Sequence, residues 1–362
     1  MLPAGRAPTR ARSRQSRRSE TELTITIAVD AMGGDHGPSE IVPASLNMLR
    51  KHENLELILV GREEILSGLT KSRAPGVAQR CRIVHAEEVV EMHDPPSWAL
   101  KNKKQSSMRL AIELVRDGGA MACVSAGNTG ALMAIARYVL KMLPGIDRPA
   151  ICTTMPGLAG DTHLLDLGAN VSPNSEQLFQ FAVMGAELAS AVENIPNPSV
   201  ALLNIGAEEI KGNDVVKQAA ALLTESHLNY AGYVEGNDIY SGKVDVIVCD
   251  GFVGNVALKA SEGVAEFLRH HARAEFEKSI YGRLAAIVSL PVLRAIQRKI
   301  DPRRYNGASL LGLRGIVIKS HGSADKVSFA HALEEAMTEV EKNVPERISS
   351  RLEALLMERP EI

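Results

Sequence analysis

Six short glycine-containing segments of this 362-residue chain combine the residue types that bind oxyanions. Glycine permits positive φ and lets the backbone approach a ligand closely. The start of a helix also offers unpaired N–H groups and a partial positive charge. Each segment follows a predicted strand and precedes a predicted helix. The six are DAMGGDHG (30–37), SAGNTG (125–130), DLGAN (166–170), NIGAEEIKGND (204–214), DGFVGN (250–255) and KSHGSAD (319–325).

One such turn is typical of an ordinary helix start, because Asn, Asp and Gly are common there. Six of them favour a phosphate-rich site beyond the carboxyl ends of parallel strands, where open α/β sheets bind ligands. We therefore expect the six turns to converge at that edge. The candidate phosphate- and substrate-binding residues are Gly33, Gly34, His36, Ser125, Gly127, Asn128, Thr129, Asp166, Asn170, Asn204, Lys211, Asp250, Gly251, Gly254 and Lys319.

The candidate catalytic residues are Lys104, Asn255 and His321. Lys104 lies in the charged loop KNKK, so a solvent-exposed lysine without a role in the site is an equal alternative. A histidine in a glycine turn, such as His36 or His321, can move a proton or orient a phosphate. It can also do no more than form a hydrogen bond at a helix entry.

Several common catalytic motifs are absent from the sequence. It contains no GxGxxG, no GxxxxGK[ST], no GxSxG and no HExxH, so dinucleotide binding, an ATP-type P-loop, a serine hydrolase and a zinc protease are poorly supported. The aspartates at strand ends could suggest a metal, but carboxylates would repel phosphate and more simply cap turns. We expect no metal and no other cofactor. Cys249, at the end of an apolar strand, is expected to pack as a small hydrophobe.

The elements that must position these residues alternate between short β-branched runs and longer helical patterns from residue 23 onward. Repeated strand–turn–helix units predict an α/β fold with a mostly parallel sheet covered by helices. The central strands are nearly continuous apolar runs, as expected when both faces are buried. Predicted helices include 129–140 and 174–192.

One stretch, 256–304, interrupts this alternation because it contains no predicted strand. Apolar residues recur every four positions from Val264 to Ile280, which indicates a helix. We predict a projecting helical hairpin for dimerisation and membrane contact, with an apolar tip near Ile287–Leu293. The candidate membrane-contact residues are Ile287, Leu290 and Leu293. The basic flank of this hairpin could instead attract an acidic protein.

Charge is unevenly distributed along the chain. The net charge is −2, which argues against a general nucleic-acid partner, yet residues 1–20 carry six Arg and one Glu. We expect residues 1–22 to be a disordered tail, although a lipid- or nucleic-acid-binding arm and a transit peptide are alternatives. Residues 23–345 are expected to form the α/β domain and 346–362 a C-terminal helix or tail. No apolar run is long enough to predict a membrane-spanning helix, and four dispersed cysteines suit reduced cytosolic thiols.

The glycine turns also resemble the motifs of a known family. In order along the chain, DAMGGDHGP, KKQSSM, SAGNTGALMA, LLDLGAN, LLNIGAEEIKG, VEGNDI, DVIVCDGFVGNVALK and GIVIKSHGSAD are similar to bacterial phosphate acyltransferases. The resemblance covers about residues 25–335. It implies a three-layer α/β sandwich like that of isocitrate and isopropylmalate dehydrogenases, without a metal or redox cofactor.

The resemblance further implies transfer of a fatty acyl group from acyl-(acyl carrier protein) to inorganic phosphate. The acyl phosphate product would then serve glycerol 3-phosphate acylation by a downstream membrane acyltransferase in phospholipid synthesis. The implied partners are the strongly acidic acyl carrier protein, inorganic phosphate, a second copy of the chain and the membrane surface. The implied location is cytoplasmic, at the inner face of the cell membrane. A phosphotransacetylase-like enzyme that uses acyl-coenzyme A, and a non-catalytic scaffold, are the alternatives.

Overall fold

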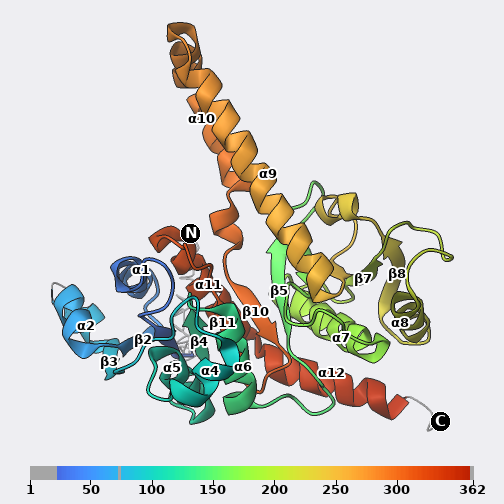
Figure 1. Cartoon of the computed structure of the whole chain (residues 1–362), viewed down its shortest axis with the longest axis horizontal. Coiled ribbons are helices and arrows are strands. Elements are labelled where there is room, and N and C mark those ends of the chain that lie inside the picture. Colours follow the sequence, from blue (N-terminus) through green and yellow to red (C-terminus); the bar gives the residue numbers. More distant parts are fainter. Residues whose placement is uncertain (1–22, 72–74, 359–362) are drawn as a thin grey trace, which may run out of the picture.

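The computed structural model describes residues 23–71 and 75–358, so the predicted arginine-rich tail lies outside the described residues. Within these ranges all strands join one eleven-stranded sheet, in the order β3-β2-β1-β4-β11-β10-β5-β6-β9-β7-β8 (Figure 1). The strands are β1 (Ile25–Asp30), β2 (Leu55–Gly61), β3 (Cys81–His85), β4 (Ala122–Ser125), β5 (Ala150–Met155), β6 (Thr162–Leu165), β7 (Ser199–Leu203), β8 (Asn229–Val234), β9 (Val246–Val248), β10 (Ala308–Leu311) and β11 (Ile316–Lys319).

The sheet consists of two parallel halves that run in opposite directions. Strands β3, β2, β1, β4 and β11 are parallel to one another, and so are β6, β9, β7 and β8. Between them, β10 is antiparallel to both β11 and β5, and β5 is antiparallel to β6. The carboxyl ends of the two halves therefore lie at opposite edges of the sheet. The prediction that all six turns converge at one edge was wrong for this reason.

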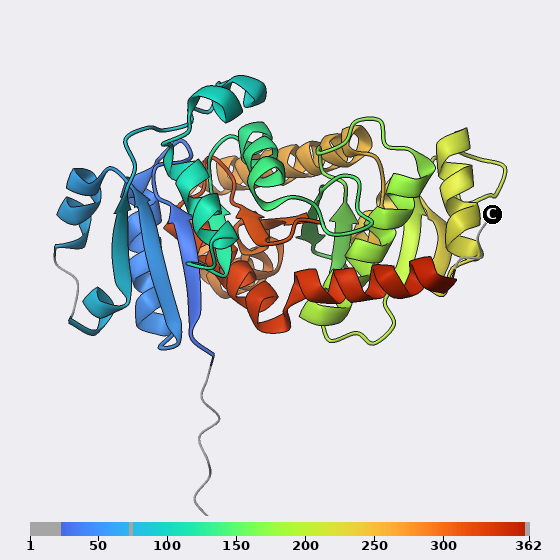
Figure 2. The same ribbon diagram turned by 90° about the horizontal axis from the view of Figure 1, so that it is seen from below.

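Helices cover both faces of the sheet, which gives the three layers that were predicted (Figure 2). The helices, including the two that project from the sheet, are α1 (Pro38–Lys51), α2 (Glu63–Thr70), α3 (Pro75–Gln79), α4 (Pro96–Asn102), α5 (Ser107–Arg116), α6 (Thr129–Leu140), α7 (Ser175–Val192), α8 (Asp214–Thr224), α9 (Gly251–Glu277), α10 (Ile280–Ile300), α11 (Lys326–Lys342) and α12 (Val344–Glu358), with short 3₁₀ turns at Gly236–Tyr240 and Pro302–Tyr305.

The alternation of side chains along β1 illustrates how the layers form. Ile27 and Val29 are buried in a cluster with residues of α1 and α11, whereas Ala28 is buried in a second cluster with residues of α5 and α6. Successive side chains of a strand point to opposite faces, so the fully apolar run is buried on both sides. In the other half of the sheet, α7 and α12 cover one face and the start of α9 packs on the other.

Helices α9 and α10 form the projecting hairpin, which stands away from the sheet (Figure 1). The position of its tip differs from the prediction. The two helices meet at Lys278–Ser279, and Ile287–Leu293 lies inside α10, which continues through Pro291. Ile287 and Leu290 are 69% and 40% exposed. The apolar segment is therefore a helical face near the tip and not the turn itself.

Candidate active site

The three glycine turns of the first half of the sheet pack against one another. The turn after β1 touches the turn after β4 so closely that a Cβ on Gly33 would lie 2.7 Å from the Gly127 nitrogen. The same turn reaches the one after β11, because the Asp35 N–H donates to the Gly322 carbonyl oxygen over 2.8 Å. Gly34 has a φ of +83°, which favours glycine. Three of the glycine turns predicted to bind an oxyanion therefore lie in one cluster.

The buried carboxylate of Asp30 holds this cluster of turns together. Asp30 is 1% exposed. Its carboxylate accepts hydrogen bonds of 2.6 Å from the hydroxyls of Ser107 and Ser125. The Ser125 hydroxyl in turn accepts from the Gly127 N–H over 3.1 Å. Burial raises the pKa of Asp30 despite these hydrogen bonds. The Gly127 N–H is consequently already bonded, and Gly127 serves the close packing of the turns.

Lys319, the last residue of β11, brings a buried amine to the same cluster. It is 8% exposed, and its Nζ donates to the carbonyl oxygens of Ala126 and Ser320. Burial lowers the pKa of Lys319 to about 8, although the negative charge of Asp30 acts in the opposite direction. An ammonium group held among glycine turns is a suitable counter-charge for a phosphate dianion.

Two turns of the second half form a separate cluster. The Asp166 carboxylate accepts from the N–H groups of Ile151, Ala169 and Asn170, and also from the Asn170 side chain. The Gly251 N–H donates to the Asn170 carbonyl oxygen over 2.7 Å. Asp166 and Asn170, both predicted as binding residues, therefore shape this turn. Burial raises the pKa of Asp166.

Helix α9 starts in this second cluster. Asp250 caps it by accepting from the Val253 N–H over 2.9 Å. A Cβ on Gly254 would lie 1.9 Å from the Asp166 carbonyl oxygen, so only glycine allows this approach. Asn255 is exposed, and its side chain lies beside Gly168. The first turn of α9 thus presents an unpaired amide next to the N-terminus of a helix.

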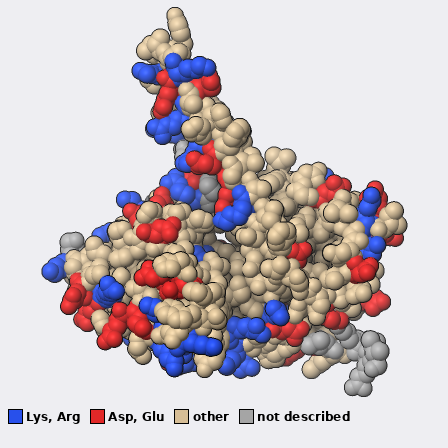
Figure 3. Space-filling view, viewed as in Figure 1, with Lys and Arg blue, Asp and Glu red and all other residues tan. Residues whose placement is uncertain are grey.

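The same helix connects the two clusters. Lys259 follows Asn255 by four residues, so both lie on one face of α9. The positive charge of Lys259 contributes to lowering the pKa of Lys319 and of His321, in addition to the larger effect of burial. Figure 3 shows that the molecular surface is hollowed at the foot of the hairpin, between the two halves. We take the two clusters of turns and the face of α9 that connects them as the candidate site.

His321 is held at the rim of the first cluster. The backbone N–H of His321 donates to the side-chain oxygen of Asn306 over 2.8 Å, and its ring Nδ1 lies 2.9 Å from the Ser323 hydroxyl. Asn306 also donates to the Ser320 hydroxyl and the Ser328 carbonyl oxygen. The His321 side chain is largely exposed, and desolvation of its buried part lowers its pKa.

The remaining predicted residues occupy more peripheral positions. The hydrogen-bonding atoms of the Asn128 side chain are already engaged. Its Oδ1 accepts from the Ala131 N–H and caps α6, and its Nδ2 donates to the carbonyl oxygens of Met92 and Asp94. Thr129, His36, Lys104 and Lys211 are exposed. The turn of Asn204 and Lys211 follows β7, and its hydrogen bonds are local or to Val234.

Three residues of the site were not among the sequence-based candidates: Ser107, Lys259 and Asn306. Ser107 belongs to the KKQSSM motif, so a signal existed, but the partner of its hydroxyl lies 77 residues away. Lys259 could have been found from its four-residue spacing to Asn255. Asn306 precedes a short strand in an irregular segment, and no pattern in the sequence points to it.

Neither a nucleophilic cysteine nor a metal cluster is found among the described residues. Cys249 is buried beside the Asp166 carbonyl oxygen, and burial strongly raises the pKa of its thiol, which confirms the expectation that it packs as a small hydrophobe. In the described ranges, no group of three or more His, Cys, Asp or Glu side chains could hold a metal ion. No helix of the described chain is both long and apolar enough to cross a membrane.

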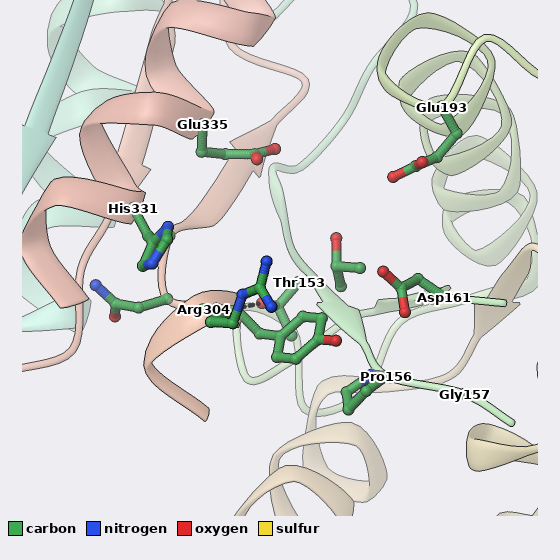
Figure 4. A pocket seen from close by; sticks show the side chains of 12 residues that line it. Thr153, Pro156, Gly157, Asp161, Glu193, Arg304, His331 and Glu335 are labelled. Carbon is green, nitrogen blue, oxygen red and sulfur yellow. Dashed lines mark hydrogen bonds between the residues drawn. The ribbon is translucent and has the colours of Figure 1, made fainter. Parts of the chain in front are cut away.

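A cavity of about 470 Å³ is lined by residues of β5, the Asn306 segment and α11 (Figure 4). Its wall includes Glu193, Glu335 and Asp161, together with Arg304 and His331. Burial raises the pKa of Glu335 to about 7. The cavity contains none of the glycine turns, so we treat it as separate from the candidate site.

Comparison with solved structures defines the class of fold. A phosphotransacetylase from Streptococcus pyogenes superposes with a TM-score of 0.60 over 88% of this chain and 94% of its own, at 16% sequence identity. A putative 4-hydroxythreonine-4-phosphate dehydrogenase from Salmonella typhimurium gives a TM-score of 0.51 over 88% of this chain and 99% of its own, at 13% identity. The protein therefore has the α/β fold shared by phosphotransacetylases and this class of dehydrogenase, as the sequence predicted.

Comparison of sequences is more specific. The family model "Fatty acid synthesis protein" matches residues 25–347. A phosphate acyltransferase of Methylococcus capsulatus is 61% identical over 90% of this chain and 96% of its own length. One from Nitrosococcus oceani is 57% identical over 93% and 99%. The chain belongs to the phosphate acyltransferase family, and it is an acyltransferase of fatty acid and phospholipid synthesis.

Proposed function

We propose that the enzyme transfers a fatty acyl group from acyl-(acyl carrier protein) to inorganic phosphate and releases an acyl phosphate. The observation that carries this proposal is the position of α9. Its first turn places Asn255 beside one cluster of turns, and four residues later Lys259 acts electrostatically on Lys319 and His321 in the other. A phosphate and a thioester carbonyl can therefore meet along a single helical face.

This reaction depends more on the positioning of the two reactants than on a strong general base. A phosphate oxygen attacks the thioester carbonyl carbon, and the carbonyl oxygen becomes an oxyanion. The intermediate then collapses, the carbon–sulfur bond breaks, and the carrier thiolate leaves with the electron pair and takes a proton from solvent. Near neutral pH phosphate is already ionised and a thiolate is a good leaving group. Holding the reactants at attack distance can supply several kcal/mol, and preorganised N–H donors stabilise the oxyanion.

We assign the positive charge for phosphate to Lys319, supported by its burial among three glycine turns. The start of α6 at Asn128 and Thr129 adds backbone N–H groups. Asn255 and the start of α9 would face the thioester carbonyl. Lys104, His321 and Lys211 are proposed to contact the substrates from the exposed rim.

The hairpin is proposed to serve dimerisation and membrane contact. Large apolar side chains are exposed on both of its helices, including Phe267 and Leu268 on α9 and Ile287 and Val288 on α10. We propose that the stem packs against a second copy and that the α10 face near the tip enters the lipid interface. A cytoplasmic enzyme bound in this way would release a long-chain acyl phosphate to a membrane acyltransferase that acylates glycerol 3-phosphate.

The test is formation of acyl phosphate by the purified enzyme. A long-chain acyl-(acyl carrier protein) is incubated with ¹⁸O-labelled inorganic phosphate, and free carrier thiol and acyl phosphate are measured by mass spectrometry. We expect labelled acyl phosphate in a one-to-one ratio with free thiol, and slower turnover with acyl-coenzyme A. A clear preference for coenzyme A would favour the phosphotransacetylase-like alternative, and absence of product with both donors would refute the proposal.

The same assay tests the residues. Asn255→Ala and Lys104→Ala should each lower turnover at saturating donor, because they remove a proposed contact to the reacting groups. Wild-type rates in either variant would remove that residue from the site.

A further inference from the structure

One surface next to the candidate site carries an excess of positive charge. It is formed by α4, the loop that leads to α5, and α6, and we call it the α4–α6 surface. Residues 95–112 and 126–146 contain six Lys or Arg and no Asp or Glu. Figure 3 shows Lys and Arg side chains grouped along the lower edge of the molecule, where Figure 1 places α4, α5 and α6. The basic residues outside the candidate site are Lys101, Lys103, Arg109, Arg137 and Lys141.

Most of this charge is not neutralised by the chain itself. Arg109 pairs with Glu113 over 3.0 Å. Within the described residues, by contrast, no ion pair involves Lys101, Lys103, Arg137 or Lys141. The alternative basic region, the hairpin, differs in this respect. There Arg269, Arg273 and Lys278 each pair with a glutamate of α9, whereas Arg283 and Arg294 form no ion pair within the described residues.

Two exposed aromatic side chains lie within the α4–α6 surface. Trp98 is 45% and Tyr138 54% exposed. Lys103 lies over the Trp98 ring at 5.7 Å, and Lys141 lies over the Tyr138 ring at 4.8 Å. Exposed aromatic side chains among unpaired cations are typical of a protein interface, where they provide contact area while the charges provide complementarity.

The surface is continuous with the candidate site. The Asn128 side chain, at the start of α6, donates to the carbonyl oxygens of Met92 and Asp94 just before α4, and Pro96 of α4 packs against Gly130. Helix α6 comprises 12 residues, and at 1.5 Å per residue its far end lies roughly 18 Å from the glycine turn. A thioester on a long flexible arm can cross this distance while its carrier stays on the surface.

We infer that the α4–α6 surface is the docking site for the acidic carrier protein that delivers the acyl thioester. This inference rests on the proposed function, which requires such a donor. Negative side chains of the carrier face Lys101, Arg137 and Lys141, and its pantetheine arm runs along α6 to the Asn128 turn. The hairpin cations Arg269, Arg273 and Lys278 contribute less to docking, because neighbouring glutamates offset them.

The experiment compares two donors with the same acyl chain, the acyl carrier thioester and the small uncharged acyl-pantetheine. The surface variant Lys101→Glu/Arg137→Glu/Lys141→Glu reverses the charge of three residues of the α4–α6 surface. The control variant Lys278→Glu/Arg283→Glu reverses the charge of two residues of the hairpin. We expect the surface variant to raise KM for the carrier thioester by about tenfold or more, as loss of charge complementarity does. Its kcat/KM for acyl-pantetheine should stay within about twofold of the wild-type value, as should the KM of the hairpin variant for the carrier.

Ionic strength provides an independent readout. Raising salt should increase the wild-type KM for the carrier and leave that of the surface variant nearly constant. If charge reversal prevents folding, the corresponding triple alanine variant should show a smaller change in the same direction.

Three results would overturn the inference: an unchanged carrier KM in the surface variant, an equal loss with both donors, or a larger effect of the hairpin variant. If the wild type acylated phosphate from neither donor, the proposed function would fail instead. Titration of unacylated carrier onto wild type and surface variant would then still decide docking, since only the wild type should bind.

Discussion

The Oδ2 of Asp30 lies 2.6 Å from the Oγ of Ser125, and both side chains are buried at the junction of two neighbouring strands. This contact joins the turn after β1 to the turn after β4. The other carboxylate oxygen holds Ser107 at the start of α5. A single carboxylate therefore fixes the relative position of three segments that are distant in sequence, and Lys319 lies within reach of its charge.

Replacing Asp30 by Ala should lower the free energy of unfolding by about 1–3 kcal/mol, because two buried hydroxyls lose their acceptor. Turnover should fall more steeply, since the three turns lose their common anchor. The control is Asp117→Asn, which removes an exposed carboxylate paired with Arg116 and should leave stability nearly unchanged. Urea unfolding measures both. Equal stability of the Asp30 variant and wild type would contradict the role of this carboxylate.

A second prediction concerns Gly254 in the first turn of α9. Gly254→Ala would place a methyl group 1.9 Å from the Asp166 carbonyl oxygen, so the turn or the helix has to move. We expect a loss of at least about 2 kcal/mol in stability and loss of acyl phosphate formation. Gly68→Ala in α2 is the matched control, because a Cβ there meets no atom within 4 Å and should stabilise the helix slightly. An active, stable Gly254→Ala enzyme would show that the contact is unimportant.

The pH dependence of stability should report on Lys319. Its folded pKa of about 8 lies below the ordinary value of 10.5, so the unfolded chain binds the proton more strongly. Stability should therefore rise with pH between about 8 and 10.5, where the unfolded state holds more protons. In Lys319→Met this part of the rise should vanish, a difference of up to roughly 3 kcal/mol. Urea unfolding of both proteins from pH 7 to 10.5 would disprove the assignment if the two curves ran parallel.

Buried glutamates near the cavity of Figure 4 should make the stability of the protein fall as pH rises, the opposite of the effect of Lys319. Burial raises the pKa of Glu339 to about 8 from 4.5, and its Oε1 has no hydrogen-bond partner among the described residues. The folded state therefore retains the proton, and stability should decrease as pH rises from about 4.5 to 8. Glu339→Gln, which cannot ionise, should weaken this decrease and be more stable than wild type at pH 9. The same pH dependence in both proteins would argue against a buried ionisable Glu339.

These contacts show what the sequence could and could not predict. Helix α6 was predicted at its observed bounds, 129–140, because its Asn cap and apolar spacing are local. The reversal of strand direction at the centre of the sheet was not, since it depends on the antiparallel pairing of β5 with β10, in which Cys152 lies opposite Ser309, far along the chain. The hairpin tip was also misplaced. The apolar stretch Ile287–Leu293 was predicted to be the tip, yet α10 passes through it on an exposed face.

The same distinction holds within the site. Glycine turns and their polar residues could be listed from the sequence, because the chemistry of a helix start is local. The sequence could not show which of these side chains remain free to contact a substrate. Asn128 and Asp166 are engaged in turn-forming hydrogen bonds, whereas Asn255 stays exposed, and only the packing of the turns decides between these outcomes.

The last prediction separates the two roles proposed for the hairpin. Phe267 lies on the stem and is 60% exposed in the single chain, while Ile287 on α10, near the tip, is 69% exposed. A charge on the stem should break the dimer, because it would bury an unpaired carboxylate between the copies. A charge at Ile287 should leave the dimer intact and weaken insertion into the lipid interface. Sedimentation of Phe267→Glu should therefore give a monomer, and Ile287→Glu/Leu290→Glu should sediment as a dimer that no longer floats with anionic liposomes. Unchanged flotation of the second variant would exclude this face of α10 from the membrane, and a dimeric Phe267→Glu would place the dimer interface elsewhere.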